Sequence, residues 1–204
     1  MTAAAERGAR RRRPLPPDRR KSRVARRFSW AAPSRCWRAN RRETIPSVTK
    51  AEVLDALRAT RAELEEVLGG MTPEQMQRPG VAGDWTVRDV LAHLLWYERE
   101  ELELITECGV AASPLWEVPY ERRNQLIREE LRDLPLEAVL GQLRGVFAQF
   151  VAAVDALSDE DLVTPGRFPG TSADRLPWRD IGLNSWMHEG EHVEGIRAWL
   201  GGAP

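Results

Sequence analysis

Four long stretches of this sequence carry apolar residues at helical spacing, and each has its own start and stop signals. The first starts at Thr49 and Glu52, whose side chains fit a capping box, and it stops at Gly69-Gly70. Its apolar residues recur mostly three or four positions apart, which places them on one face of a helix. A helix with one apolar face must bury that face against another element.

The remaining pattern predicts three more long helices, over about 86–107, 135–157 and 177–200, and a shorter helix over 121–131. Short helical turns are expected after Thr72 and Ser158, which resemble N-caps. No stretch alternates between apolar and polar residues as a half-buried strand does. The sequence therefore predicts an all-α fold, a four-helix bundle with short connecting helices.

The charge of the chain is divided between two regions. Residues 1–46 hold 15 Lys and Arg but 3 Asp and Glu, whereas the rest of the chain holds 15 basic and 28 acidic residues. The basic part is rich in arginine and proline, with the run Arg10–Arg13, and has no helical or strand periodicity. Too few apolar residues are present to offset the entropy of ordering, so residues 1–47 are expected to be a disordered leader and 48–204 the bundle.

Three interpretations of this leader remain open. It is typical of an inert tail or of a wrongly assigned start, with Val48 as the alternative first residue. An Arg-rich, acid-poor segment also resembles a transit peptide. A nucleic-acid arm is the third, but a disordered basic tail alone specifies no groove or base contact, so nucleic acid is not expected as a partner. We expect the leader to be dispensable for folding.

The composition excludes two classes of protein. No stretch approaches 18 consecutive apolar residues, so no membrane-spanning helix is expected. The two cysteines, Cys36 and Cys108, are too few for a disulfide framework. These features favour a reducing compartment, and we expect a cytoplasmic protein.

The chain has three histidines, and their positions favour a metal site. His188 and His192 are four residues apart on the last predicted helix, so both side chains lie on one face. His93 lies within the second predicted helix, and the three imidazoles converge if these helices face each other. Three nitrogen ligands with an open fourth position are typical of catalytic zinc, and nickel, iron or manganese would also fit. The other interpretation is that each histidine is an ordinary solvated or hydrogen-bonded side chain.

The segment 188–192 also matches H-E-x-x-H, the signature of zincin proteases. A zincin needs a third ligand, usually well downstream, and the residues after His192 contain no further histidine. Gly190 would also lie inside the catalytic helix. A protease is therefore a poor interpretation. Glu100, Glu189 and Glu191 are candidates for a catalytic base, although solvated roles are the simpler interpretation for such abundant residues.

The order and spacing of several motifs resemble a known family. Residues 83–93, GDWTVRDVLAH, resemble the W-[ST]-x-x-[DE]-x-[LIV]-x-H segment of the DinB/YfiT-like superfamily, and residues 188–200 are similar to its closing H-x-x-x-H helix. Asn124 and the helix starts near 134 and 158 resemble its ClbS/DfsB branch. The resemblance covers about residues 48–201, and the leader has no counterpart.

The resemblance implies an all-helical bundle, often a homodimer, that holds a divalent metal through His93, His188 and His192. Relatives include transferases that use bacillithiol or mycothiol, mycothiol-dependent maleylpyruvate isomerases and a hydrolase that opens the cyclopropane of colibactin. The isomerase branch has a glutamate where His188 stands and an extra C-terminal domain, so it fits less well.

Two functions are compatible with these observations. The first is a metal-dependent enzyme that acts on small electrophilic substrates by hydrolysis or by transfer to a low-molecular-weight thiol, in detoxification or self-resistance. The second is a non-catalytic helical protein that binds a small molecule. A bound metal with an open position would favour the enzyme.

Overall fold

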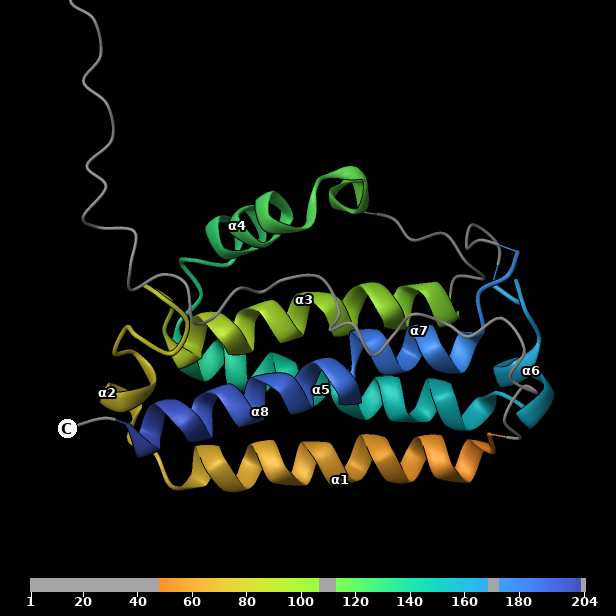
Figure 1. Ribbon diagram of the computed structural model, residues 1–204, viewed down its shortest axis with the longest axis horizontal. Coiled ribbons are helices and arrows are strands. Elements are labelled where there is room, and N and C mark those ends of the chain that lie inside the picture. The colour runs from red at the N-terminus through yellow and green to blue at the C-terminus, as the bar shows by residue number, and fades with distance from the viewer. Residues whose placement is uncertain (1–47, 107–112, 169–172, 203–204) are drawn as a thin grey trace, which may run out of the picture. The chain divides into compact units, whose positions relative to one another are not determined.

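The computed structural model describes residues 48–106, 113–168 and 173–202. Its three longest helices are α1 (Lys50–Gly69), α3 (Val87–Thr106) and α5 (Leu136–Ala156), and two shorter ones, α7 (Pro177–Asn184) and α8 (Trp186–Gly201), follow at the end of the chain. Helix α3 packs mainly against α5, and α1 against α8 (Figure 1). In the described residues the only strand-like feature is an isolated bridge between Ala82 and Trp85. The predicted all-α bundle is confirmed.

Short elements complete the bundle. They are α2 (Pro73–Met76), the 3-10 helix η2 (Pro114–Glu117), α4 (Tyr120–Glu130) and α6 (Asp159–Val163). Capping boxes start three helices, because Thr49, Thr72 and Ser158 each accept a hydrogen bond from the backbone three residues later. These local signals explain why sequence and structure agree closely on where most helices begin.

The last predicted helix differs from the structure, which breaks it at Ser185. The backbone of Ser185, with φ −132° and ψ −104°, is not helical, and its hydroxyl donates a hydrogen bond to the Ile181 carbonyl. At Gly182 an added Cβ would lie 2.7 Å from the Trp186 ring, so that ring needs a glycine beneath it. The break divides the packing: α7 contacts α3 and α6, whereas α8 contacts mainly α1.

Two buried apolar clusters hold the helices together. The larger joins α3, α4, α5 and α8, with Leu91, Leu95 and Ile127 among its fully buried members. The smaller joins the first part of α1 to the second half of α5 and to α7, through residues such as Leu57 and Phe150. Burial of large side chains like these contributes about 1.5–3 kcal/mol each. Packing against α4 and α5 therefore fixes α3, which carries His93.

Helix α4 lies over the outer side of α3 (Figure 1). Within the described parts of the chain, no helix is both long enough and apolar enough to cross a membrane. The predicted leader, residues 1–47 with Cys36, and Cys108 lie outside the described residues.

Candidate metal centre

The three histidines lie together inside the bundle, between α3 and α8. His93 comes from the second turn of α3, and His188 and His192 come from successive turns of α8. All three are buried, with 2% of His93, 9% of His188 and 2% of His192 exposed. The start of α8 directly after Ser185 places His188 in its first turn.

The ring nitrogens of these residues converge. Nε2 of His188 lies 2.9 Å from Nε2 of His93 and 3.0 Å from Nε2 of His192. One ligand nitrogen from each residue lies within 4.8 Å of the others. A neutral imidazole nitrogen carries either one hydrogen or one lone pair, so the His188 nitrogen satisfies at most one of its two short contacts. Hydrogen bonding among the rings alone does not account for the arrangement.

Burial keeps the imidazoles neutral. It lowers the pKa of His188 to about 4, since charging a ring inside the bundle costs solvation energy. The pKa values of His93 and His192 are also well below the ordinary value, first through burial and then through repulsion from His188. All three rings are therefore neutral at pH 7, the form in which imidazole binds a metal.

Aromatic rings line one side of this group. The Tyr97 ring centroid lies 4.8 Å from those of both His93 and His188, and the Trp85 centroid lies 5.7 Å from that of His93. The Tyr97 hydroxyl donates a hydrogen bond of 3.2 Å to Oδ1 of Asn124 on α4. In the described residues the Nδ1 atoms of His93 and His188 have no hydrogen-bond partner, so packing against these rings orients them.

The three candidate bases have other surroundings. Both carboxylate oxygens of Glu189 accept from Arg61 on α1, at 3.1 and 2.7 Å. Glu100 accepts a 2.8 Å hydrogen bond from the indole of Trp116. Glu191 is exposed on α8. Glu189 therefore belongs to an ion-pair group, and a catalytic role for any of the three glutamates stays a prediction.

That group was not predicted from the sequence. Arg61 also bonds the buried carboxyl of Glu98, so one guanidinium joins α1, α3 and α8. Burial raises the pKa of Glu98 to about 8, although Arg61 opposes the shift. Glu98 is 37 residues from Arg61 in the chain, and Glu189 is 128 residues from it. No local sequence motif predicts contacts over such separations.

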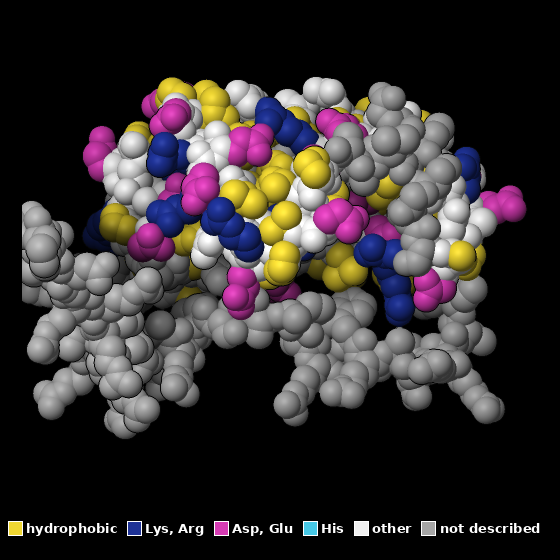
Figure 2. Space-filling view, turned by 90° about the horizontal axis from the view of Figure 1, so that it is seen from above, with side chains coloured by type: hydrophobic (Ala, Val, Ile, Leu, Met, Phe, Trp, Pro, Cys, Tyr) yellow, Lys and Arg dark blue, Asp and Glu magenta, His cyan; other side chains and the backbone are white. Residues whose placement is uncertain are grey.

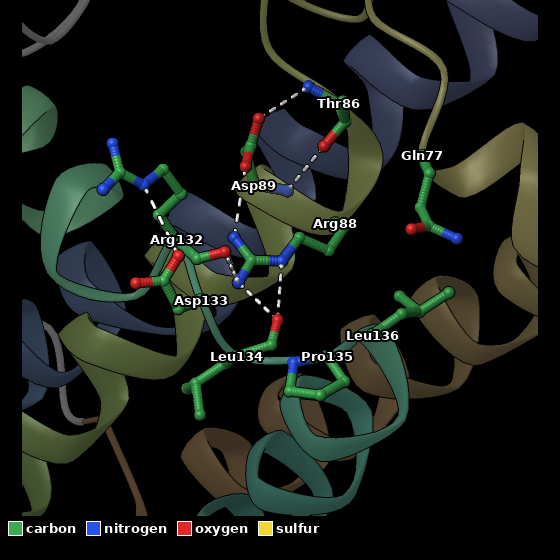
Figure 3. Close-up of a pocket in the computed structure, with 9 residues that line it drawn as sticks. All are labelled: Gln77, Thr86, Arg88, Asp89, Arg132, Asp133, Leu134, Pro135 and Leu136. Atoms are coloured by element: carbon green, nitrogen blue, oxygen red, sulfur yellow. Dashed lines mark hydrogen bonds and ion pairs between the residues drawn. The ribbon is translucent and has the colours of Figure 1, made fainter.

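A pocket of about 380 Å³ lies away from the histidines, where the start of α3 meets the segment before α5 (Figure 3). Arg88 lines this pocket, and the Arg88 guanidinium donates hydrogen bonds to the carbonyls of Leu131, Arg132 and Leu134. Asp89 bonds the backbone N–H of Thr86. These contacts are internal, so Arg88 anchors the α4–α5 connection.

Figure 2 looks onto the side of the bundle that carries α4. Hydrophobic side chains lie there between charged ones, and no histidine is visible among the residues drawn in colour. This view agrees with the low exposure of the three imidazoles.

The sequence profile described as the DinB superfamily matches this chain twice, over residues 4–105 and 56–196. The second match includes most of the described bundle. The chain belongs to the DinB superfamily. The first match extends into the leader, for which the resemblance predicted no counterpart.

Relatives of this DinB-superfamily chain agree with its fold. A protein of Bacillus licheniformis named "Putative metal-dependent hydrolase" is 27% identical over 147 residues, which are 70% of this chain and 76% of that protein. The crystal structure of the colibactin self-resistance protein ClbS, in complex with double-stranded DNA, is similar with a TM-score of 0.66 and 17% identity. It covers 79% of this chain and 100% of ClbS.

A third similar structure is DfsB, described as a sibling lethal factor precursor, with a TM-score of 0.62 and 20% identity. It covers 76% of this chain and 96% of DfsB. At such identities these two structures establish the fold alone. The resemblance to the DinB superfamily and the fold that it implies are confirmed.

Proposed function

We propose that this protein is a metal-dependent enzyme whose divalent ion is held by His93, His188 and His192. The observation that carries the proposal is the convergence of three buried, neutral imidazoles, with Nε2 atoms 2.9 and 3.0 Å apart. Zinc–nitrogen bonds are about 2.0–2.1 Å, so neighbouring ligands at right-angled or tetrahedral positions lie roughly 2.9–3.4 Å apart. The two measured nitrogen pairs therefore lie at the spacing of neighbouring ligands on one ion.

The number of ligands favours catalysis. In the described residues no fourth His, Cys, Asp or Glu joins the group. A divalent ion held by three neutral ligands keeps its charge and an open position, at which it lowers the pKa of a water or a thiol. The protein's own contribution is to keep the imidazoles neutral by burial and to hold their orientation through Tyr97 and Asn124.

The substrate class follows from this chemistry. An acidified water or thiol attacks electrophilic carbon, so we propose small electrophiles as substrates, with hydrolysis or transfer to a low-molecular-weight thiol as the reaction. The name of the Bacillus licheniformis relative supports hydrolysis. The self-resistance described for ClbS supports a role in detoxification. The resemblance alone supports thiol transfer.

One observation favours the alternative, a non-catalytic binding protein. The histidines are almost closed off from solvent, and at most 9% of any imidazole-bearing residue is exposed. A closed site suits retention of a ligand better than rapid turnover. The homodimer and the cytoplasmic location stay predictions, which sedimentation equilibrium and cell fractionation would test.

A substrate panel distinguishes the two functions. Wild-type protein, metal-loaded or treated with a chelator, would be incubated with an activated halide or an epoxide, with and without thiols such as cysteine. The enzyme proposal predicts turnover that needs the metal and is lost in His93→Ala. Glu194→Gln, an exposed change on α8, serves as the control and should keep full activity. Metal-independent turnover, or full activity in His93→Ala, would overturn the proposal.

A further inference from the structure

Among the described residues, Arg123 lacks an ion pair of the kind that three other buried or half-buried arginines of the bundle make. Arg61 pairs with Glu98 and Glu189, Arg88 with Asp89, and Arg128 with Asp84 and Asp89. Arg123, half-buried on α4, makes no ion pair with any residue that the structure describes. Its positive charge is therefore not neutralised within the described bundle.

Aromatic rings surround the Arg123 guanidinium. Its central carbon lies 4.7 Å from the ring centroid of Trp116, 5.6 Å from that of Tyr120 and 5.9 Å from that of Tyr97. Rings attract the cation through their faces, and a stacked guanidinium keeps the N–H groups along its edge free to donate. The rings thus fix the side chain without using all of its donors.

Tyr97 connects this arginine to the histidine centre. The same ring contacts Arg123 and also packs against His93 and His188, with centroids 4.8 Å apart in each case. Asn124, the next residue on α4, accepts the hydrogen bond from Tyr97 and so holds that ring between the two.

One donor of Arg123 is left unsatisfied. Its Nε is buried and has no hydrogen-bond partner among the described residues. A buried donor without a partner costs about 1–3 kcal/mol, and a charged one costs more. Such a cost is recovered when a ligand supplies the acceptor. A carboxylate matches the planar edge of a guanidinium and accepts two parallel hydrogen bonds.

We propose that Arg123 binds a carboxylate group of the molecule that reacts at the histidine centre. This inference rests on the proposed function, and it narrows the substrates to electrophiles that carry a carboxylate. The arginine orients the substrate from α4, while the histidines lie on α3 and α8 across the Tyr97 ring.

The proposal is tested by ligand binding, without any assay of activity. Benzoate and its neutral analogue benzamide would be titrated calorimetrically into metal-loaded wild type, Arg123→Gln, Arg123→Lys and Arg122→Gln. Arg122 is the matched control, because it is the exposed neighbour on the same helix. We expect wild type to bind benzoate at least ten-fold more tightly than benzamide. Arg123→Gln should lose that preference, Arg123→Lys should keep part of it, and Arg122→Gln should keep all of it.

Equal benzoate affinity in wild type and Arg123→Gln would overturn the proposal, and so would a wild type that binds no benzoate up to its solubility. The metal content of every variant is measured as well, so that a failure of the Arg123 proposal can be told from a failure of the proposed metal-dependent function. If Arg123→Gln keeps its metal and its benzoate affinity, the proposal for Arg123 alone is wrong. If wild type holds no metal but binds benzoate through Arg123, the metal-dependent function is wrong and the carboxylate site stands.

Discussion

Two buried polar groups lie side by side on the same helices, and they are built in opposite ways. The first is the ion-pair group of Arg61, Glu98 and Glu189, and the second is the histidine centre. Helix α3 carries Glu98 and His93, and α8 carries Glu189 next to His188. In the ion-pair group, the guanidinium of Arg61 bonds one carboxyl group on each of two other helices. In the histidine centre, three ligands of one kind point toward a common position.

This difference shows how a buried polar group that stabilises the fold can be told from one that forms a functional site. Both groups contain buried titratable side chains with shifted pKa values, so burial and pKa alone do not distinguish them. What distinguishes them is whether the partners complete each other. A completed ion pair loses stability when one member is removed. The three imidazoles instead converge on one position, which the proposed metal ion would occupy.

The largest expected effect is on stability, from Arg61→Ala. This change leaves two buried carboxyl groups without their cation, and losing one partner of a buried ion pair costs about 3–5 kcal/mol. We expect the free energy of unfolding in urea to fall by that amount. Arg58→Ala, an exposed change on the same helix, should alter it by less than about 0.5 kcal/mol. Similar small effects in both variants would show that the ion-pair group is not structural.

The next effect concerns stabilisation by zinc. A ligand that binds only the folded chain adds about 2.7 kcal/mol of stability when its concentration is 100 times its dissociation constant. We expect zinc to raise the thermal midpoint of wild type accordingly and to have no effect on His192→Ala. Without metal, the stability of wild type and that of His192→Ala should differ far less than the stability of wild type and that of Arg61→Ala. An equal zinc effect in both proteins would contradict the comparison.

The smallest effect is a dependence of stability on pH, through Glu98. Burial raises the pKa of this carboxyl to about 8, whereas the unfolded chain releases the proton near the ordinary value of 4.5. Between these values the folded state binds more protons, so stability falls as pH rises. From pH 7 to 8 this carboxyl contributes a loss of about 1 kcal/mol in metal-free wild type. The three imidazoles contribute a smaller change of opposite sign, because they are partly protonated at pH 7 in the unfolded chain only.

Glu98→Gln removes this titrating group and keeps its shape, so its free energy of unfolding should fall by about 1 kcal/mol less than that of wild type over the same pH range. Urea denaturation at several pH values measures both proteins. A wild-type curve that stays level, or the same fall in Glu98→Gln, would show that Glu98 is ionised in the folded state.

The helices could largely be predicted because their signals are local. The capping boxes at Thr49, Thr72 and Ser158 and the apolar spacing between them predict most helix starts. The spacing of His188 and His192 likewise follows from one turn of helix. The break at Ser185 was missed, because no proline marks it and the close contact of Gly182 with Trp186 is visible only in three dimensions.

Other parts of the site could not be predicted because their partners are distant in the chain. Arg61 reaches Glu189, which is 128 residues away, and Arg123 meets Tyr97 only because α4 lies over α3. Glu189 shows the consequence, since a solvated role was the simpler interpretation of its sequence position, yet the structure buries it against Arg61. The packing of helices, rather than any motif, decides these contacts.

The central claim is that three histidines hold one divalent ion, and metal analysis of tag-free protein tests it most directly. The chain has no other histidine, so the stoichiometry has a simple interpretation. After zinc loading and dialysis, we predict one ion per wild-type chain and none in His188→Ala, with Glu194→Gln unchanged. A wild type that retains no ion, or a full equivalent of zinc in His188→Ala, would contradict the account.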